Sequence, residues 1–135
     1  MSKRWWLGAV LRVSGVGMMF SLFFVFCPFS WMMQINGWLG MGEELLYTPV
    51  TSYLIRTLSG MYTIIGGLFV FVSYDLPRYR DIIRLLGAIA IAAGIGITIL
   101  DAILRLPLMW TALEGPMTIA LGAIILYLSR PGGRR

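Results

Sequence analysis

The sequence contains no histidine and a single cysteine, Cys27, and each shortage removes a class of function. Histidine is the commonest general base near neutral pH and the commonest metal ligand, so its absence argues against the usual hydrolase, haem and zinc sites. A lone cysteine allows neither an internal disulfide nor a paired-thiolate metal site. The sequence also has no serine-hydrolase elbow, phosphate-binding loop or zinc-protease motif. We therefore expect a protein that is not an enzyme and that has no cofactor and no metal site.

Charged residues are scarce as well: they make up 13% of the 135 residues, against about 25% in a soluble domain. Hydrophobic residues make up 59% and are gathered in four runs, at residues 5–27, 50–73, 82–105 and 108–129. Each run is close to the ~20 residues that a helix needs to cross a bilayer. Because backbone groups in lipid must be hydrogen-bonded within their own segment, the runs predict helices. We expect an all-α, polytopic membrane protein in which residues 1–135 form a single four-transmembrane-helix bundle.

The first run has a rival interpretation as a signal peptide, because Lys3 and Arg4 precede it. It is longer than the ~7–15 apolar residues of a signal peptide, and no small-residue cleavage site follows it. Phe26, directly before the cysteine, is too large for a lipoprotein cleavage site. We therefore expect the run at 5–27 to be retained as a membrane span.

Basic residues are distributed unevenly between the two sides of the predicted spans. Only Arg56 and Arg105 fall on one side. The other nine of the eleven fall on the opposite side: Lys3, Arg4, Arg12, Arg78, Arg80, Arg84, Arg130, Arg134 and Arg135. Because lysine and arginine concentrate in cytoplasmic loops, we expect both termini in the cytoplasm. The net charge of +5 suits anionic lipid, and no motif indicates a nucleic-acid partner.

The predicted connections and the small residues of the spans indicate how the helices are joined and packed. The connection at 28–49 is too apolar for an aqueous loop and is interrupted by glycine. It is predicted to lie on the outer leaflet, or to cover the helix ends as a lid. Small residues recur every four positions in the spans, which predicts close packing within the bundle or between two copies. The third span has two such rows of small residues. One row is Ala88, Ala92 and Gly96, and the other is Ala90, Gly94 and Thr98.

Four charged residues fall inside the predicted spans, near their outer ends: Arg56, Asp101, Arg105 and Glu114. A charge at mid-bilayer costs roughly 2.5–3.5 kcal/mol, so two acids and two bases are expected to neutralise one another. Asp101 and Arg105 are four residues apart, which places them on one face of a continuous helix. Asp101 and Arg56 form the pair that we favour. Neighbouring side chains predicted to add hydrogen bonds are Tyr53, Ser59, Tyr62, Thr111 and Thr118.

The charged cluster leaves two questions open at the level of the sequence. Pro116 either kinks the fourth span or begins it, in which case Glu114 caps a helix N-terminus. The cluster itself is either a structural clamp on the outer helix ends or a polar cavity for a proton, an ion, a headgroup or a small solute.

Three segments carry a resemblance to a known group of proteins: YLIRTLSGMY at 53–62, SYDLPRYRD at 73–81, and DAILRLP with EGP at 101–116. Their layout resembles the small bacterial four-helix membrane proteins called DoxX-like or BphX-like. The resemblance implies a multi-pass protein of the bacterial inner (plasma) membrane. Some members look like accessory subunits of membrane oxidoreductases, but this chain has neither a second cysteine nor a redox motif. Small multidrug transporters differ, because they carry a glutamate in the first helix.

These features predict a non-enzymatic integral membrane protein that is a structural or accessory subunit of a membrane complex. Its expected partners are the lipid bilayer and other membrane protein subunits or copies of itself. The alternative is a small oligomeric transporter or ion or proton pathway, in which Asp101 and Glu114 are the titrating groups.

Overall fold

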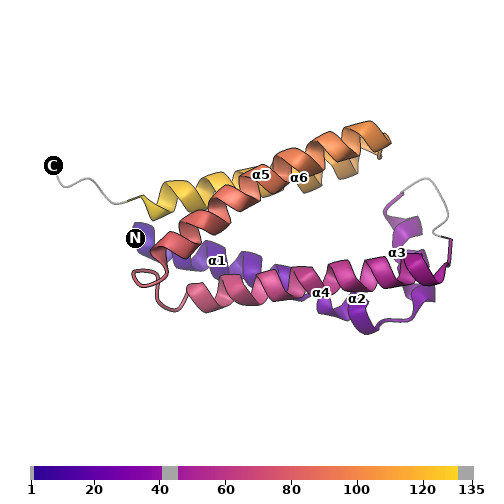
Figure 1. Cartoon of the computed structure of the whole chain (residues 1–135), viewed down its shortest axis with the longest axis horizontal. Coiled ribbons are helices and arrows are strands. Elements are labelled where there is room, and N and C mark those ends of the chain that lie inside the picture. Colours follow the sequence, from indigo (N-terminus) through magenta and orange to yellow (C-terminus); the bar gives the residue numbers. More distant parts are fainter. Residues whose placement is uncertain (1, 41–45, 131–135) are drawn as a thin grey trace. The chain divides into compact units, whose positions relative to one another are not determined.

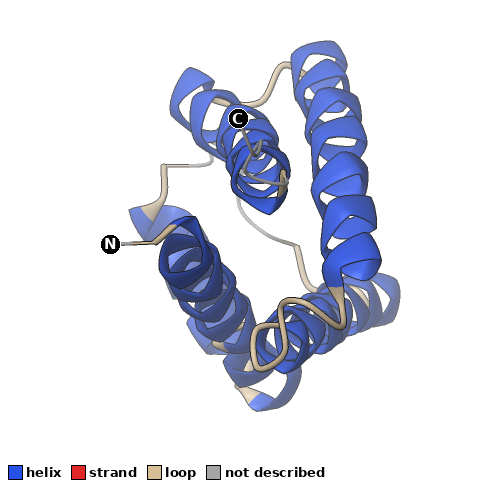
Figure 2. Cartoon of the chain, turned by 90° about the vertical axis from the view of Figure 1, so that its left-hand side faces the viewer, coloured by secondary structure: helices blue, strands red, loops and turns tan. Residues whose placement is uncertain are grey.

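All regular structure in the described part of the chain is α-helical, which confirms the predicted all-α class. The computed structural model describes residues 2–40 and 46–130. Arg134, Arg135 and residues 41–45 of the predicted outer connection lie outside the described residues. In chain order the helices are α1 (Lys3–Met19), α2 (Leu22–Phe26), α3 (Phe29–Trp38), α4 (Pro49–Val72), α5 (Arg80–Leu104) and α6 (Leu108–Ser129) (Figures 1 and 2).

Within residues 2–40 and 46–130, four helical segments are long and apolar enough to cross a membrane, as predicted: Lys3–Phe26, Pro49–Val72, Arg80–Leu104 and Leu108–Ser129. In the 18-residue apolar stretch of each segment, between 11% and 22% of the residues are buried within the chain. Large apolar side chains are therefore mostly exposed, as expected where lipid rather than water surrounds the helices.

Two features depart from the predicted boundaries. The first span is broken at Phe20 and Ser21, between α1 and α2. The predicted outer connection contains a helix, α3, and Met32 in this helix is only 4% exposed. The start of α4 follows simple rules, since Pro49 fills the first helical position and the Thr48 hydroxyl accepts the backbone N–H of Thr51 at 3.0 Å.

The chain divides into two compact units, residues 13–70 and residues 1–12 together with 71–135. In the unit of residues 13–70, α1 and α4 touch backbone to backbone at Gly15 and Gly66. A Cβ added at Gly15 would lie 2.7 Å from the carbonyl oxygen of Gly66. Gly17 and Gly67, one or two residues away, have nothing within 4 Å of an added Cβ. Close approach therefore depends on one glycine of each helix.

In the second unit α5 and α6 form an antiparallel hairpin with a glycine seam. A Cβ added at Gly94 would lie 2.8 Å from the Gly115 carbonyl oxygen, and one at Gly122 would lie 2.6 Å from that of Gly87. Of the two predicted small-residue rows of α5, the row through Gly94 therefore faces α6. The other row, Ala88, Ala92 and Gly96, is exposed. In the same unit, the Arg12 Nε donates to the Ser73 hydroxyl at 3.2 Å and ties the middle of α1 to the residue that follows α4.

Candidate functional site

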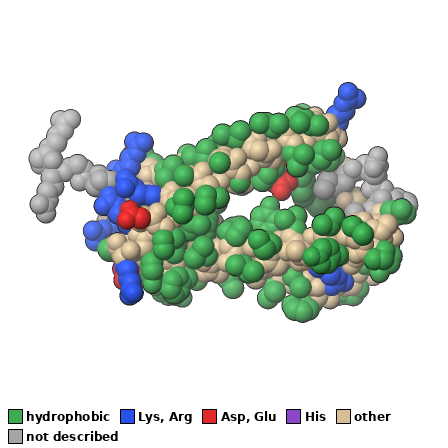
Figure 3. Space-filling view, viewed as in Figure 1, with side chains coloured by type: hydrophobic (Ala, Val, Ile, Leu, Met, Phe, Trp, Pro, Cys, Tyr) green, Lys and Arg blue, Asp and Glu red, His purple; other side chains and the backbone are tan. Residues whose placement is uncertain are grey.

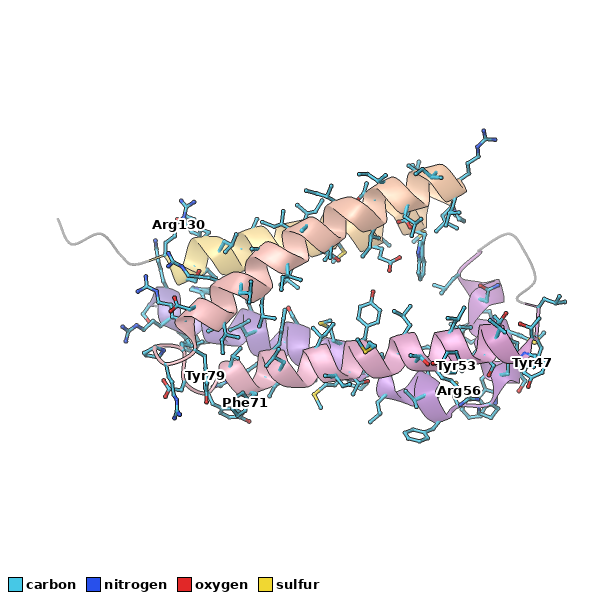
Figure 4. The ribbon with its side chains drawn as sticks, in the orientation of Figure 1. Tyr47, Tyr53, Arg56, Phe71, Tyr79 and Arg130 are labelled. Carbon is cyan, nitrogen blue, oxygen red and sulfur yellow. The ribbon has the colours of Figure 1, made fainter. Side chains whose placement is uncertain are left out.

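Arg56, in the unit of residues 13–70, is a helix-capping residue (Figure 4). Its guanidinium donates to the carbonyl oxygen of Val25, to that of Cys27 at 3.1 Å and to the Ser52 hydroxyl at 3.3 Å. The two carbonyls lie at the C-terminal end of α2, where a helix has oxygens without intrahelical partners and a partial negative charge. Arg56 thus fastens α4 to the end of the first span. Its predicted pairing with Asp101, which belongs to the other unit, stays a prediction.

A polar contact one turn along α4 also joins it to the first span. The Ser21 hydroxyl donates to the Ser59 carbonyl oxygen at 2.8 Å and lies 3.1 Å from the Thr63 hydroxyl. Ser59 is buried at 8% exposure, whereas Tyr53 is 65% exposed and Tyr62 is half-buried. Of the predicted supporting residues on α4, Ser59 therefore takes part in packing through its backbone, and Tyr53 lies at the surface (Figure 4).

Asp101 is the buried acid of the second unit, with 4% of its surface exposed. It follows Gly87 and Gly94 at two-turn intervals along the buried row of α5. The antiparallel glycine seam continues in that register to the start of α6, so Asp101 lies beside the N-terminal end of α6. The partial positive charge of a helix N-terminus favours a carboxylate there. Among the described residues, however, its Oδ2 is buried without a hydrogen-bond partner.

Arg105 does not share a helix face with Asp101, which corrects the expectation from their spacing. Helix α5 ends at Leu104, and Arg105 has the left-handed conformation, with φ of 56° and ψ of 41°. The backbone N–H groups of Arg105 and Leu106 donate to the carbonyls of Ala102 and Asp101 at 3.4 and 3.1 Å. These bonds form a Schellman motif, which stops the helix and turns the chain towards α6. Arg105 therefore occupies the left-handed position that ends a helix, where glycine is the usual residue.

Glu114 lies inside α6, not at its start. The helix runs through Pro116, so a helix beginning at Pro116 is excluded and Glu114 is not its N-cap. The hydroxyls of Thr111 and Thr118 donate to the carbonyls of Pro107 and Glu114, at 3.5 and 2.7 Å. Both threonines therefore bond within their own helix. Asp101, Arg105 and Glu114 belong to one unit and Arg56 to the other.

The two contacts by which Arg56 caps α2, which the sequence did not predict, involve backbone oxygens. The carbonyls of Val25 and Cys27 carry no signal in the letters of the sequence, apart from Pro28, which marks the end of α2. Within the described ranges 2–40 and 46–130, no group of three or more histidine, cysteine, aspartate or glutamate residues could hold a metal ion. Comparison with known proteins finds no family model, no curated protein and no solved structure that matches this chain.

Proposed function

We propose that the chain is a non-enzymatic structural or accessory component of a membrane complex, inserted in a bacterial inner membrane with both termini in the cytoplasm. The observation that carries the proposal is the exposed row of small residues on α5. Ala88, Ala92 and Gly96 are exposed, and a Cβ added at Gly96 would meet nothing within 4 Å. Helix surfaces that face lipid gain nothing from small residues, whereas surfaces that face another helix do, because small residues let backbones approach.

The glycine seam of the same helix supports this interpretation. At Gly94 the backbone of α6 occupies the space that a side chain would take. The row at Ala88, Ala92 and Gly96 offers a similar smooth surface on the side of α5 that does not contact α6. A second membrane helix could therefore pack there in the manner of α6.

The orientation rests on charge. Lys3, Arg4, Arg80 and Arg130 line one cavity in the unit of residues 1–12 and 71–135. Nine basic residues are predicted to lie on one side of the membrane, and these four of them lie around the same cavity. A concentration of basic residues at one end of the spans favours a cytoplasmic location for that end.

The test is the native mass of the protein after gentle extraction, combined with substitutions on α5. We expect the wild type in an assembly larger than one chain, and Ala92→Leu to reduce that assembly because the added side chain separates the helices. Ile99→Leu is the control, since Ile99 is already large and is 55% exposed. The mass also tells copies of this chain from other subunits. A monomeric wild type, or equal assembly in both variants, would contradict the proposal.

Asp101 favours a second candidate function, a proton pathway in an oligomer. Among the described residues the Asp101 Oδ2 is buried without a hydrogen-bond partner, and ionisable residues within membrane helices often mark proton pathways. Proteoliposomes with an internal pH-sensitive dye would measure the flux. This function predicts that Asp101→Asn abolishes proton flux while the native mass stays unchanged. Equal flux in wild type, variant and empty liposomes would exclude it.

A further inference from the structure

A basic cavity of about 580 Å³ lies where the N-terminal ends of α1 and α5 meet the C-terminal end of α6. Four basic residues line it, Lys3, Arg4, Arg80 and Arg130, and its lining contains no acidic residue. Lysine and arginine side chains visibly gather at this end of α5 and α6 (Figure 3), and Arg130 extends from the end of α6 (Figure 4). All of the lining belongs to the unit of residues 1–12 and 71–135.

The four cations of this cavity have no direct ionic partner among the described residues: none of them makes an ion pair or a side-chain hydrogen bond there. Lys3 lies over the ring of Tyr127, with its Nζ 4.8 Å from the ring centroid. Four like charges around one space repel one another, so the cavity attracts an anion. Guanidinium groups suit phosphate in particular, because their planar donors match its oxygens in pairs.

The lining also contains apolar residues. Leu76 and Leu128 are half-buried and therefore keep some surface that a ligand can contact. The cavity is therefore amphipathic, with both charged and apolar side chains around one space. A volume of this size is typical of sites for small molecules. A free inorganic anion would use only the charged part, whereas a lipid would use both.

Aromatic residues place this end of the unit at the level of lipid headgroups. Trp5, Trp6 and Tyr127 are 54%, 49% and 58% exposed, and all belong to helix ends next to the cavity. Tryptophan and tyrosine concentrate at the membrane–water interface, because their rings are apolar and their N–H or O–H group is polar. The four cations therefore lie where lipid phosphates are found.

We infer that this cavity binds the phosphate of an anionic phospholipid headgroup, with Arg80 and Arg130 as the principal phosphate ligands and the apolar lining against the upper acyl chains. The same phosphate chemistry could come from a free anion. The apolar lining favours the lipid, and the experiment separates the two sources.

The experiment counts lipids bound to the full chain by native mass spectrometry, after release from nanodiscs of phosphatidylglycerol mixed with phosphatidylcholine. Loss of one arginine–phosphate hydrogen bond lowers affinity by about fivefold, so R80Q with R130Q should lower retained phosphatidylglycerol by roughly twentyfold. The matched control is R78Q with R84Q, which removes the same charge from the same end but outside the lining. The control loses only diffuse, screened attraction and should retain phosphatidylglycerol within about twofold of the wild type.

Three results of the mass-spectrometry experiment would overturn the inference. Equal losses in both double variants would mean diffuse attraction to basic residues, and full retention in R80Q with R130Q would mean that the cavity is not used. Displacement of the lipid by millimolar inorganic phosphate would make it a site for soluble anions. Circular dichroism checks that each variant is folded. As a measurement on the unaltered chain, phosphatidylglycerol should raise the thermal midpoint more than phosphatidylcholine does, and an equal rise would also contradict the inference.

Discussion

Replacement of Gly115 by alanine tests whether the glycine seam holds α5 and α6 together. The added Cβ would lie 2.9 Å from the Gly94 carbonyl oxygen and would overlap the Thr98 hydroxyl. Ordinary contacts begin at 3.4 Å, so the helices must separate by about half an ångström or Thr98 must move. The Thr98 hydroxyl now donates to the Gly94 carbonyl at 2.7 Å, and its movement would break that bond.

The expected loss follows from these opposing effects. Overpacking costs roughly 1–3 kcal/mol, and loss of a hydrogen bond adds about 0.5–1.5 kcal/mol. Alanine returns up to about 1 kcal/mol, because it forms helix more readily than glycine. We therefore expect Gly115→Ala to lower the free energy of unfolding by about 2 kcal/mol. Gly96→Ala, on the open side of α5, has only the favourable effect and should be neutral or slightly stabilising.

The assay is equilibrium unfolding in mixed micelles of dodecylmaltoside and sodium dodecyl sulfate, followed by far-ultraviolet circular dichroism. Adding Thr98→Ala to Gly115→Ala removes the nearest overlapping atom, so part of the lost stability should return. The reasoning is refuted if Gly115→Ala and Gly96→Ala have the same stability. That result would mean that α5 and α6 separate at no cost and that their close approach is not a source of stability.

Two further predictions concern the arginines inside the predicted spans and use the same assay. Arg56→Gln should lower the free energy of unfolding by about 1–3 kcal/mol, because the carbonyls of Val25 and Cys27 lose their donor. Arg56→Lys should recover only part of this, since one ammonium group does not reproduce the guanidinium fork, and full recovery would contradict the capping role. Arg105→Gly should raise stability by about 1 kcal/mol, because glycine adopts a φ of 56° without steric cost. A less stable Arg105→Gly protein would mean that the side chain of Arg105 matters more than its backbone.

The sequence was sufficient for the approximate limits of the four described helical segments that could cross a membrane, because such segments are recognised by their apolar length. The third span is a typical case: predicted at 82–105, it runs from Arg80 to Leu104. The break in the first span was not predictable in this way, since the residues on both sides of it are apolar. Ser21 at the break donates to the carbonyls of Met18 and Ser59. A break that depends on a contact with another helix leaves no local pattern.

The candidate site was harder to predict because charges are visible in a sequence and backbone acceptors are not. The pairing of Arg56 with Asp101 stays a prediction, and the sequence gives no sign that the Arg56 guanidinium also donates to the carbonyl oxygens of Val25 and Cys27. The expectation that Arg105 shares a helix face with Asp101 assumed a helix that continues through Arg105. The left-handed conformation of Arg105 shows that the helix does not continue. Such a turn is hard to foresee at arginine, since glycine is the usual residue there.

Arg56 and Asp101 therefore differ in what they add to the protein. Two of the hydrogen bonds of Arg56 fasten α4 to the end of the first helical segment, and the third stays within α4, so stability is sufficient reason for its presence. Asp101 is as buried as the apolar core, yet within the described residues its Oδ2 has no partner, and a buried oxygen of this kind costs about 1–3 kcal/mol. The N-terminal dipole of α6 offsets roughly 0.3–1 kcal/mol of that cost, and an apolar side chain of similar size would remove the cost altogether. Packing alone does not account for an acid at this position, and Asp101 is the residue at which a function other than assembly should be sought.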